Sequence, residues 1–273
     1  MKQALKWIWQ IISYVLLFVG MQGVVMGLLW TTVPQLPRIS AEVEAVLMSI
    51  TFGIALSSIL TLLVVWLFLH KEWEQENFWE WQQGAGTNMG LCALAGIFIN
   101  GAIIGILYFF QLDEIFQDHG ELMERIVQGN PLVIFITVVF LAPILEEVIF
   151  RGIILHRLMR TSMNTWLAII IPALLFGIIH GNVLQGSYAF IIGIAFGLVY
   201  VWFRSIWAPI IMHITFNMNL LPGLLSSYLP GNENEASMSE VAFTLIAIAL
   251  LLVSISLLWV LWKRRKVVDS IEL

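Results

Sequence analysis

Residues 141–151 read LAPILEEVIFR and place three charged residues within an apolar stretch. Glu146 and Glu147 are adjacent in this stretch, and Arg151 follows the second glutamate by four residues. The residues around them are apolar enough for the hydrocarbon core of a bilayer. Because a charge near the centre of a membrane helix costs about 2.5–3.5 kcal/mol on insertion scales, such residues normally face a protein interior or a water-filled cavity. We therefore take the two carboxylates and the guanidinium as candidates for a functional site.

The composition of the whole chain predicts a membrane protein. Hydrophobic residues make up 60% of the sequence and charged residues 11%, whereas soluble domains carry about 25% charged residues. A helix needs about 17–25 apolar residues to span a bilayer. Eight runs approach or reach this length: 8–30, 45–69, 91–110, 132–155, 165–181, 187–203, 206–224 and 240–262. The pattern predicts an all-α, polytopic integral membrane protein of about eight transmembrane helices, with one membrane domain over residues 1–273. We expect the lipid bilayer as its surroundings and no nucleic-acid partner.

The distribution of basic residues predicts the topology, because Lys and Arg concentrate on the cytoplasmic side of membrane proteins. With the N-terminus inside, most of them fall on the inner side: Lys2, Lys6, Lys71, Arg157, Arg160, Arg204 and the cluster at 263–266. The acidic loops at 111–130 and 225–239 then lie outside. We therefore expect both termini in the cytoplasm, and we interpret the first apolar run as an uncleaved spanning helix.

Three short polar patterns lie on three of the predicted helices. They are Glu146-Glu147-x-x-x-Arg151 on the fourth helix, Phe176-x-x-x-His180 on the fifth and His213-x-x-x-Asn217 on the seventh. Residues four apart share a helix face, so Glu147 can pair with Arg151. Glu146 points about 100° away from Glu147 and stays available for another role. His213 and Asn217 also share a face and can address one cavity, so we expect the active site between helices four, five and seven.

This set of side chains suits the attack of water on a carbonyl group. A carboxylate withdrawn from water holds a proton more readily and can act as a general base near neutral pH. Two imidazoles and a carboxamide can donate hydrogen bonds to a developing oxyanion. A glutamate with two histidines is also a ligand set of catalytic zinc. A serine or cysteine nucleophile needs an adjacent base, but Ser187 and Ser205 lie at span ends and Cys92 has no polar neighbour in the sequence.

In this order on separate helices, the three patterns resemble those of the CAAX-protease and bacteriocin-processing (Abi) family of intramembrane endopeptidases. The key letters of all three are present, over roughly residues 131–220. One such pattern occurs often by chance, whereas three in order within a polytopic membrane protein are specific. The resemblance implies a catalytic core at 131–220 inside the membrane domain and an enzyme that hydrolyses peptide bonds.

The resemblance also implies a role for each matched residue. Glu146 would activate the attacking water, and His180 would assist it and handle protons. His213 and Asn217 would bind the substrate carbonyl and stabilise the tetrahedral intermediate. These four residues are the predicted catalytic set.

Members of this family have been described both as metalloproteases and as metal-free, glutamate-dependent proteases, and the residues fit both. In either form Glu147 and Arg151 would be a supporting ion pair that orients Glu146. In the metal-dependent form Glu146, His180 and His213 would hold the metal, and Zn²⁺ is the expected ion. The metal-free form requires no cofactor.

The sequence leads to one main hypothesis and two alternatives. The main hypothesis is an intramembrane endopeptidase that uses glutamate-activated water on a peptide or membrane-protein substrate, located in a bacterial plasma membrane. A eukaryotic setting would instead suggest prenylated proteins. The first alternative is a non-catalytic membrane scaffold or bacteriocin-immunity protein of the same fold. The second is a transporter whose buried carboxylates relay protons, although no internal repeat is visible.

Several further polar and aromatic residues are interpreted as structural. Phe176 belongs to a pattern but is expected to serve packing rather than chemistry. Asn182 is expected to be a loop or packing residue. His70, His119 and His156 fall at span ends or in loops, so we expect them to be solvated.

Overall fold

The computed structural model describes residues 2–35, 40–76, 78–80, 85–127, 130–220 and 240–265. Within these ranges every regular element is a helix, and no strand occurs among them. Six helical segments of the described chain are long and apolar enough to cross a membrane: Trp9–Gln35, Ile50–Gln75, Gly86–Phe109, Pro131–Met159, Val183–Phe203 and Val241–Lys263. The predicted all-α, polytopic membrane fold is therefore confirmed.

Two of the eight expected spans are shorter in the structure. α10 (Thr165–Ile179) has 15 residues and α12 (Trp207–Asn217) has 11, whereas a full crossing takes about 20. The run expected at 206–224 extends past residue 220 into a part of the chain outside the described residues. The total of eight transmembrane helices therefore stays a prediction.

The chain forms two compact units, the first from Met1–Glu80 with Leu122–Pro172 and the second from Trp81–Glu121 with Ala173–Leu273. The first holds α1 (Lys2–Thr32), η1 (Val33–Gln35), α2 (Ala41–Met48), α3 (Ile50–Gln75), α7 (Pro131–Ile134), η2 (Phe135–Leu141), α8 (Ala142–Glu147), η3 (Val148–Leu155) and α9 (His156–Met159). The second holds α4 (Gly86–Phe109), α5 (Leu112–Ile115), α11 (Val183–Phe203), α12, η4 (Met218–Leu220) and α14 (Glu240–Lys263), and both units share α6 (Gln117–Val127) and α10. The acidic pattern thus lies in the first unit and His180, His213 and Asn217 in the second. The single membrane domain expected over residues 1–273 stays a prediction.

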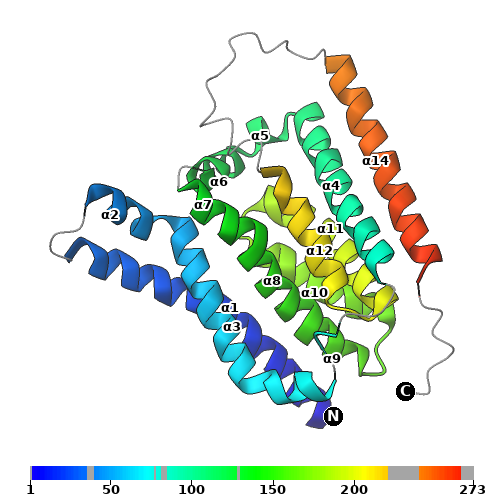
Figure 1. The fold of residues 1–273 in the computed structure, drawn as a ribbon, viewed down its shortest axis with the longest axis horizontal. Helices are drawn as coiled ribbons and strands as arrows, with labels where there is room; N and C mark the ends of the chain where they lie inside the picture. Colours follow the sequence, from blue (N-terminus) through cyan, green and yellow to red (C-terminus); the bar gives the residue numbers. More distant parts are fainter. Residues whose placement is uncertain are drawn as a thin grey trace. The chain divides into compact units, whose positions relative to one another are not determined.

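The first unit packs the helix of the acidic pattern against α3, and α3 runs beside α1 (Figure 1). Val65, Leu69 and Trp73 of α3 are buried together with Val148 and Ile153 of η3. Four of these five side chains are aliphatic, and between membrane helices such a contact is stabilised mainly by van der Waals packing. This cluster fixes the helix that follows the two glutamates.

The helix that carries the acidic pattern is continuous from Pro131 to Met159, but its hydrogen-bond pattern changes twice. η2 and η3 are π-helical and flank α8, in which both glutamates lie. The Ala142 N–H donates to the Thr137 carbonyl five residues back, and the Pro143 that follows has no N–H to donate. π-Helical turns are rare and frequently occur at functional sites. The π-helical segments on either side therefore indicate α8 as the candidate functional part of this span.

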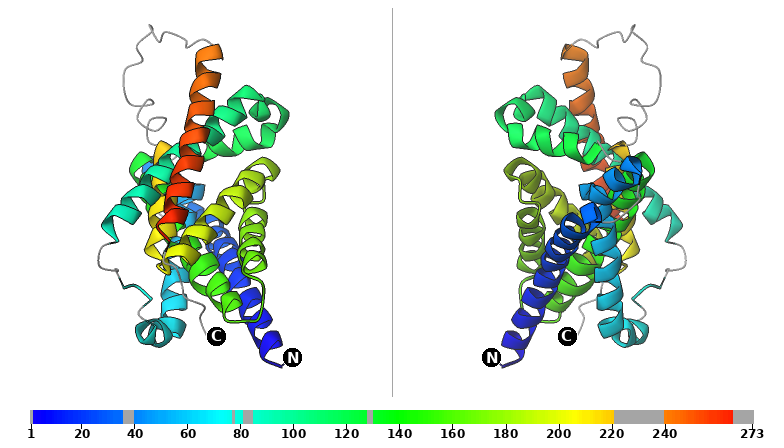
Figure 2. Two further views of the ribbon diagram at one scale, coloured as in Figure 1. Left: turned by 90° about the vertical axis from the view of Figure 1, so that its right-hand side faces the viewer. Right: turned by 90° about the vertical axis from the view of Figure 1, so that its left-hand side faces the viewer.

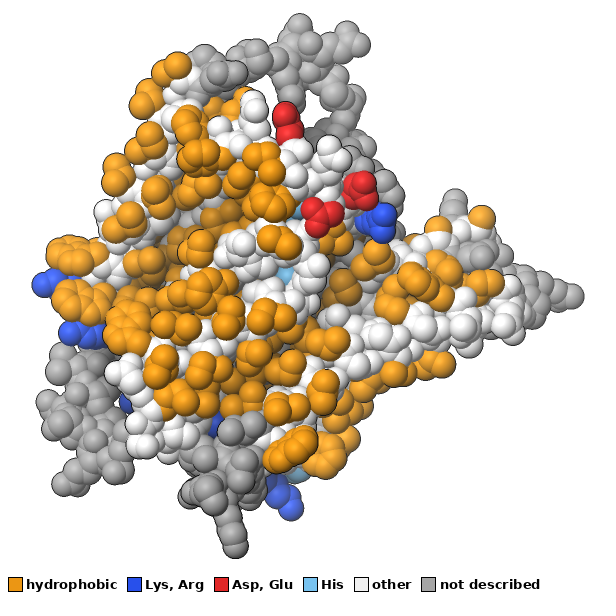
Figure 3. All heavy atoms as spheres, turned by 180° about the vertical axis from the view of Figure 1, so that it is seen from behind, with side chains coloured by type: hydrophobic (Ala, Val, Ile, Leu, Met, Phe, Trp, Pro, Cys, Tyr) orange, Lys and Arg blue, Asp and Glu red, His pale blue; other side chains and the backbone are white. Residues whose placement is uncertain are grey.

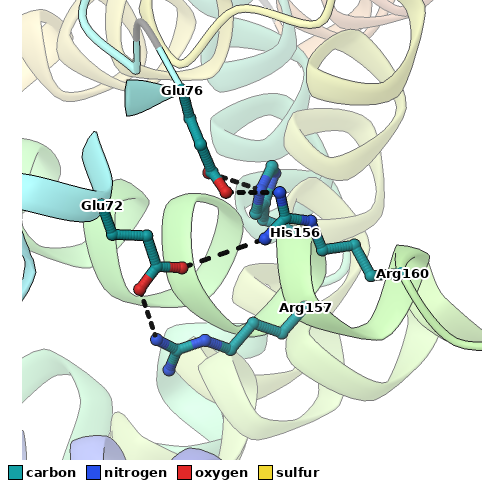
Figure 4. Close-up of polar contacts among 5 residues, drawn as sticks. All are labelled: Glu72, Glu76, His156, Arg157 and Arg160. Atoms are coloured by element: carbon teal, nitrogen blue, oxygen red, sulfur yellow. Dashed lines mark hydrogen bonds and ion pairs between the residues drawn. The ribbon is translucent and has the colours of Figure 1, made fainter. Parts of the chain in front are cut away.

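Charged side chains join the end of α3 to α9 (Figure 4). His156 Nε2 lies 3.0 Å from Glu76 Oε2, and Arg157 Nη2 lies 3.5 Å from Glu72 Oε2. Arg160 also pairs with Glu76 and lies 3.9 Å from Glu72 Oε1. His156 was expected to be solvated, and this prediction is wrong. It is partly buried against the Glu76 carboxylate, because the turn after α3 brings Glu76 over it. These contacts hold the end of the helix that carries the acidic pattern to the end of α3.

The second unit is built around α4, which contacts α12 and α14 (Figure 1). α14 runs as an unbroken helix in the left view of Figure 2. A Cβ atom on Gly96 of α4 would lie 2.1 Å from the Met212 carbonyl oxygen of α12, and one on Gly105 would lie 2.2 Å from Ala247 Cβ of α14. Small residues allow membrane helices to approach this closely. Glycines of α4 therefore set the position of α12, which carries His213.

Apolar side chains cover the described surface. Figure 3 shows hydrophobic side chains over most of the described part of one face, with charged ones gathered in a few places. The helices α1 and α14 expose many large apolar residues, among them Leu16, Val24, Leu28, Trp30, Val241, Leu245, Leu252 and Trp259. Exposed apolar surface on this scale requires lipid rather than water around it. The protein is an integral membrane protein.

Candidate active site

The ion pair predicted from the four-residue spacing is present in the first unit. Arg151 Nη1 donates to Glu147 Oε1 at 2.9 Å, and the exposed fraction of both residues is 0%. A buried ion pair contributes little net stability, but loss of one partner leaves an uncompensated charge in a low-dielectric interior. Glu147 and Arg151 therefore depend on each other for burial.

Glu146 differs from Glu147 in its surroundings, although the two are adjacent in α8. The side chain of Glu146 is partly exposed, whereas that of Glu147 is fully buried. Glu147 Oε1 accepts the hydrogen bond that Arg151 Nη1 donates. The two carboxylates of the first unit therefore differ in burial: that of Glu147 is fully enclosed and bonded to the guanidinium, and Glu146 is only partly buried.

His180 lies at the end of α10 in the second unit, and its ring orientation is fixed. Its Nδ1 lies 2.7 Å from the Phe176 carbonyl oxygen, four residues back. A carbonyl oxygen only accepts, so Nδ1 carries the proton. In the neutral ring the lone pair is then on Nε2, the nitrogen available for a proton or a metal ion. A histidine that acts as a ligand or base commonly has its other nitrogen bonded in this way.

His213 is held in a wall of aromatic rings. The side chain is 4% exposed. Its ring stacks on Phe196 of α11, with centroids 4.6 Å apart, and meets the edge of Phe176 at 5.7 Å. Phe176 also contacts the His180 ring edge-on at 4.8 Å. Phe176 therefore lies between the two histidines, so its packing role, predicted from the sequence, is to set the spacing of the two imidazoles.

Asn217 is the last residue of α12, one turn after His213, and its side chain is partly exposed. Two residues later, Asn219 Nδ2 donates to the Ile97 carbonyl oxygen of α4 at 3.0 Å. Together with the close contact at Gly96, this bond fixes both ends of the segment that contains His213 and Asn217. α4, which carries none of the three patterns, thus positions the third pattern.

The turn after His180 is tight and depends on glycine. Gly181 has a φ of +67°, a left-handed conformation that glycine adopts without steric cost. Before the turn, a Cβ on Gly177 would lie 2.6 Å from the Gly186 carbonyl oxygen, so α10 and α11 touch through their backbones. The chain therefore reverses directly behind His180.

The predicted residues form two groups. The structure brings Glu146, Glu147 and Arg151 together in the first unit, and His180, His213 and Asn217 are all in the second. The conditional zinc ligands Glu146, His180 and His213 are drawn from both groups, so this set stays a prediction. Phe196 was missed by the sequence analysis because its only signal is an unremarkable position in an apolar run.

His119 was expected to be solvated, and this prediction is wrong. Its side chain is 5% exposed, and Nδ1 lies 2.7 Å from Asp113 Oδ1. Its Nε2 lies 3.3 Å from the Tyr188 hydroxyl of α11. The polar sequence of this loop concealed its burial, because contacts with a residue 69 positions away decide it.

Comparison with known proteins agrees with the motifs. Residues 128–219 match the sequence profile of a family described as type II CAAX prenyl endopeptidase Rce1-like. A Bacillus subtilis (strain 168) protein named "Putative membrane peptidase YdiL" is 29% identical over 165 residues, which are 59% of this chain. The match covers 66% of that relative, just under two thirds of its length. No solved structure matches the chain significantly. Residues 128–219, which contain all three patterns, therefore match the Rce1-like profile, in agreement with the resemblance to the CAAX-protease and bacteriocin-processing family.

Proposed function

We propose that the protein is an intramembrane endopeptidase that cleaves a peptide bond with water activated by Glu146. The observation that carries the proposal is the division of the two glutamates. Glu147 is buried and bonded to Arg151, whereas Glu146 on the same helix is partly exposed. A general base needs a carboxylate and access to water, and of the two glutamates we assign this role to the partly exposed Glu146.

The proposed reaction assigns a step to each residue. Glu146 takes a proton from water, and the water oxygen forms a bond with the carbonyl carbon of the substrate. His213 and Asn217 donate hydrogen bonds to the oxyanion that develops. The carbon–nitrogen bond then breaks. The proton that Glu146 took from water passes to the lone pair on Nε2 of His180 and from there to the leaving amine, which returns Glu146 to its carboxylate form. The Nδ1–H bond of His180 to the Phe176 carbonyl supports this role, because it keeps Nε2 as the nitrogen that exchanges protons.

A metal-assisted form of the same reaction uses the same residues. Glu146, His180 and His213 would hold Zn²⁺, which would polarise the carbonyl and lower the pKa of bound water. The ring orientation of His180 fits this donor set, since Nε2 is the nitrogen that carries the lone pair. Chelation by 1,10-phenanthroline separates the two forms: complete loss of cleavage, restored by Zn²⁺, identifies the metal-dependent one, and unchanged cleavage the metal-free one.

The proposed substrate is a peptide or membrane protein, and the proposed location is a bacterial plasma membrane with both termini in the cytoplasm. The match to a CAAX prenyl endopeptidase family makes a farnesylated CAAX peptide the first probe. Membrane proteomes of cells with wild-type or Glu146→Gln protein extend the search to natural substrates. A natural substrate would persist uncut in the variant.

The test compares Glu146→Gln with Glu114→Gln, the same change at an exposed residue of α5. With an internally quenched farnesylated CAAX peptide, Glu146→Gln is expected to slow cleavage about 10²–10⁴-fold without a change in thermal unfolding. Glu114→Gln should cleave like the wild type. Full activity of Glu146→Gln would contradict the mechanism. If neither the peptide nor the membrane proteome is cut by wild-type protein, and cells with Glu146→Gln behave as wild type, the scaffold or immunity alternative is favoured.

A further inference from the structure

The turn that carries His180 is bonded to a residue far away in the sequence. Asn182 Nδ2 donates to Asp118 Oδ2 at 2.7 Å. Asp118 lies in the first turn of α6, and Asn182 stands two residues after His180. Asn182 is 8% exposed. The bond therefore ties α6 to the reversal between α10 and α11 within the second unit.

Asn182 uses both ends of its amide. Its Oδ1 accepts from the Gln185 N–H at 2.9 Å and so caps the N-terminus of α11. The two partners fix the orientation of the amide, because a backbone N–H only donates and a carboxylate only accepts. Aspartate or serine would cap the helix equally well. Capping alone therefore does not require the Nδ2 group that contacts Asp118.

A second contact from α6 reaches the next part of α11. His119 donates through Nδ1 to Asp113 Oδ1 at 2.7 Å, and its Nε2 lies 3.3 Å from the Tyr188 hydroxyl. The two rings also meet edge-on with centroids 5.9 Å apart. Asp118 and His119 thus hold the first two turns of α11 at neighbouring points. His119, whose burial the sequence did not predict, is therefore one of the two residues through which α6 contacts this part of the chain.

We propose that Asp118 and Asn182 form a positioning pair for His180, an inference that rests on the proposed function. Gly181 is the single residue between His180 and Asn182, so a shift of Asn182 is passed to His180 through one residue in a left-handed conformation. The His180 side chain bonds to the backbone of its own helix at Phe176. The pair with Asp118 supplies the connection of this turn to α6.

The decisive variants exchange the two side chains. Asn182→Asp keeps the cap of α11 but places a second carboxylate against Asp118. Repulsion between the two carboxylates should displace the turn that carries His180. Because a misplacement near 1 Å can cost about 10²-fold in rate, we expect cleavage to slow by about that factor. Asp118→Asn alone keeps an acceptor for Asn182 and should retain most of the rate. The double variant Asp118→Asn/Asn182→Asp restores a donor and an acceptor in exchanged positions and should recover most of the loss. Asp118→Ala removes the acceptor at an exposed site and should lower the rate without unfolding.

The matched control is Asn164→Asp. Asn164 Oδ1 accepts from the Trp166 N–H near the opposite end of α10, and its side chain is exposed. The same chemical change there should leave cleavage of the farnesylated peptide unchanged. Thermal unfolding of each variant separates positioning from loss of the fold.

A second readout does not depend on cleavage. Deuterium exchange at the imidazole carbon between the ring nitrogens, measured by mass spectrometry in the Glu146→Gln background, reports on His180 and His213 separately. Asn182→Asp should change the exchange half-life of His180, leave that of His213 unchanged, and return to normal in the double variant. Unchanged exchange and cleavage in Asn182→Asp, or no recovery in the double variant, would overturn the positioning role. Wild-type protein that cuts no probe would count against the proposed function, while the exchange result still decides the pair.

Discussion

The acidic group of candidate residues in the first unit and the histidine group in the second are built in different ways. In the first unit two opposite charges, Glu147 and Arg151, are fully buried and bonded to each other in a helix with π-helical turns. In the second unit His213 is held by aromatic rings and by close helix contacts at glycine. We therefore expect changes in the acidic group to act mainly on folding, with Glu146 as the exception. Changes in the histidine group should act mainly on position.

The largest effect on stability is expected from Glu147→Gln. Loss of one member of a buried ion pair leaves the charge of Arg151 without its partner, which costs about 3–5 kcal/mol. Unfolding by denaturant in detergent micelles measures this loss. The double variant Glu147→Gln/Arg151→Met removes both charges and should regain much of it. If Glu147→Gln alone is as stable as the wild type, the acidic group is not held by this ion pair.

A smaller effect on stability, with a clear effect on cleavage, is expected from Gly96→Ala. The new Cβ would lie 2.1 Å from the Met212 carbonyl oxygen and 2.3 Å from Thr215 Oγ1, so α12 must shift and move His213. Overpacking of this kind costs about 1–3 kcal/mol. The control Gly90→Ala is on the same helix, where no atom lies within 4 Å of the added Cβ. Equal unfolding and cleavage for both variants would show that α4 does not position α12.

The smallest effect is expected from Phe196→Leu. An aromatic pair is worth about 0.5–1.5 kcal/mol beyond its burial, so the loss of the ring that stacks on His213 should lower stability only slightly. Its effect on the peptide cleavage rate should be larger than its effect on unfolding. Measurement of both in the same preparation checks the claim. A variant with much lower stability but a normal cleavage rate would contradict the expectation that changes in the histidine group act mainly on position.

The sequence predicted those features that depend on neighbouring residues in the chain. The apolar runs gave the helical membrane fold, and the four-residue spacing gave the ion pair between Glu147 and Arg151. It did not predict the bond between Arg157 and Glu72, which are 85 positions apart, or the burial of His119. Contacts of this kind depend on how helices pack, and neither periodicity nor charge spacing contains that information. The aromatic support of His213 was missed for the same reason.

We expect Glu146 and His213 to act in one reaction, as proposed above, and a comparison of single and double variants measures whether they do. Cleavage of the farnesylated peptide is measured for Glu146→Gln, His213→Ala and the double variant, with thermal unfolding as the check on folding. Residues that act as one catalytic unit show strongly non-additive losses. The double variant is expected to be no slower than the slower single variant. Losses that multiply in the double variant would contradict this expectation.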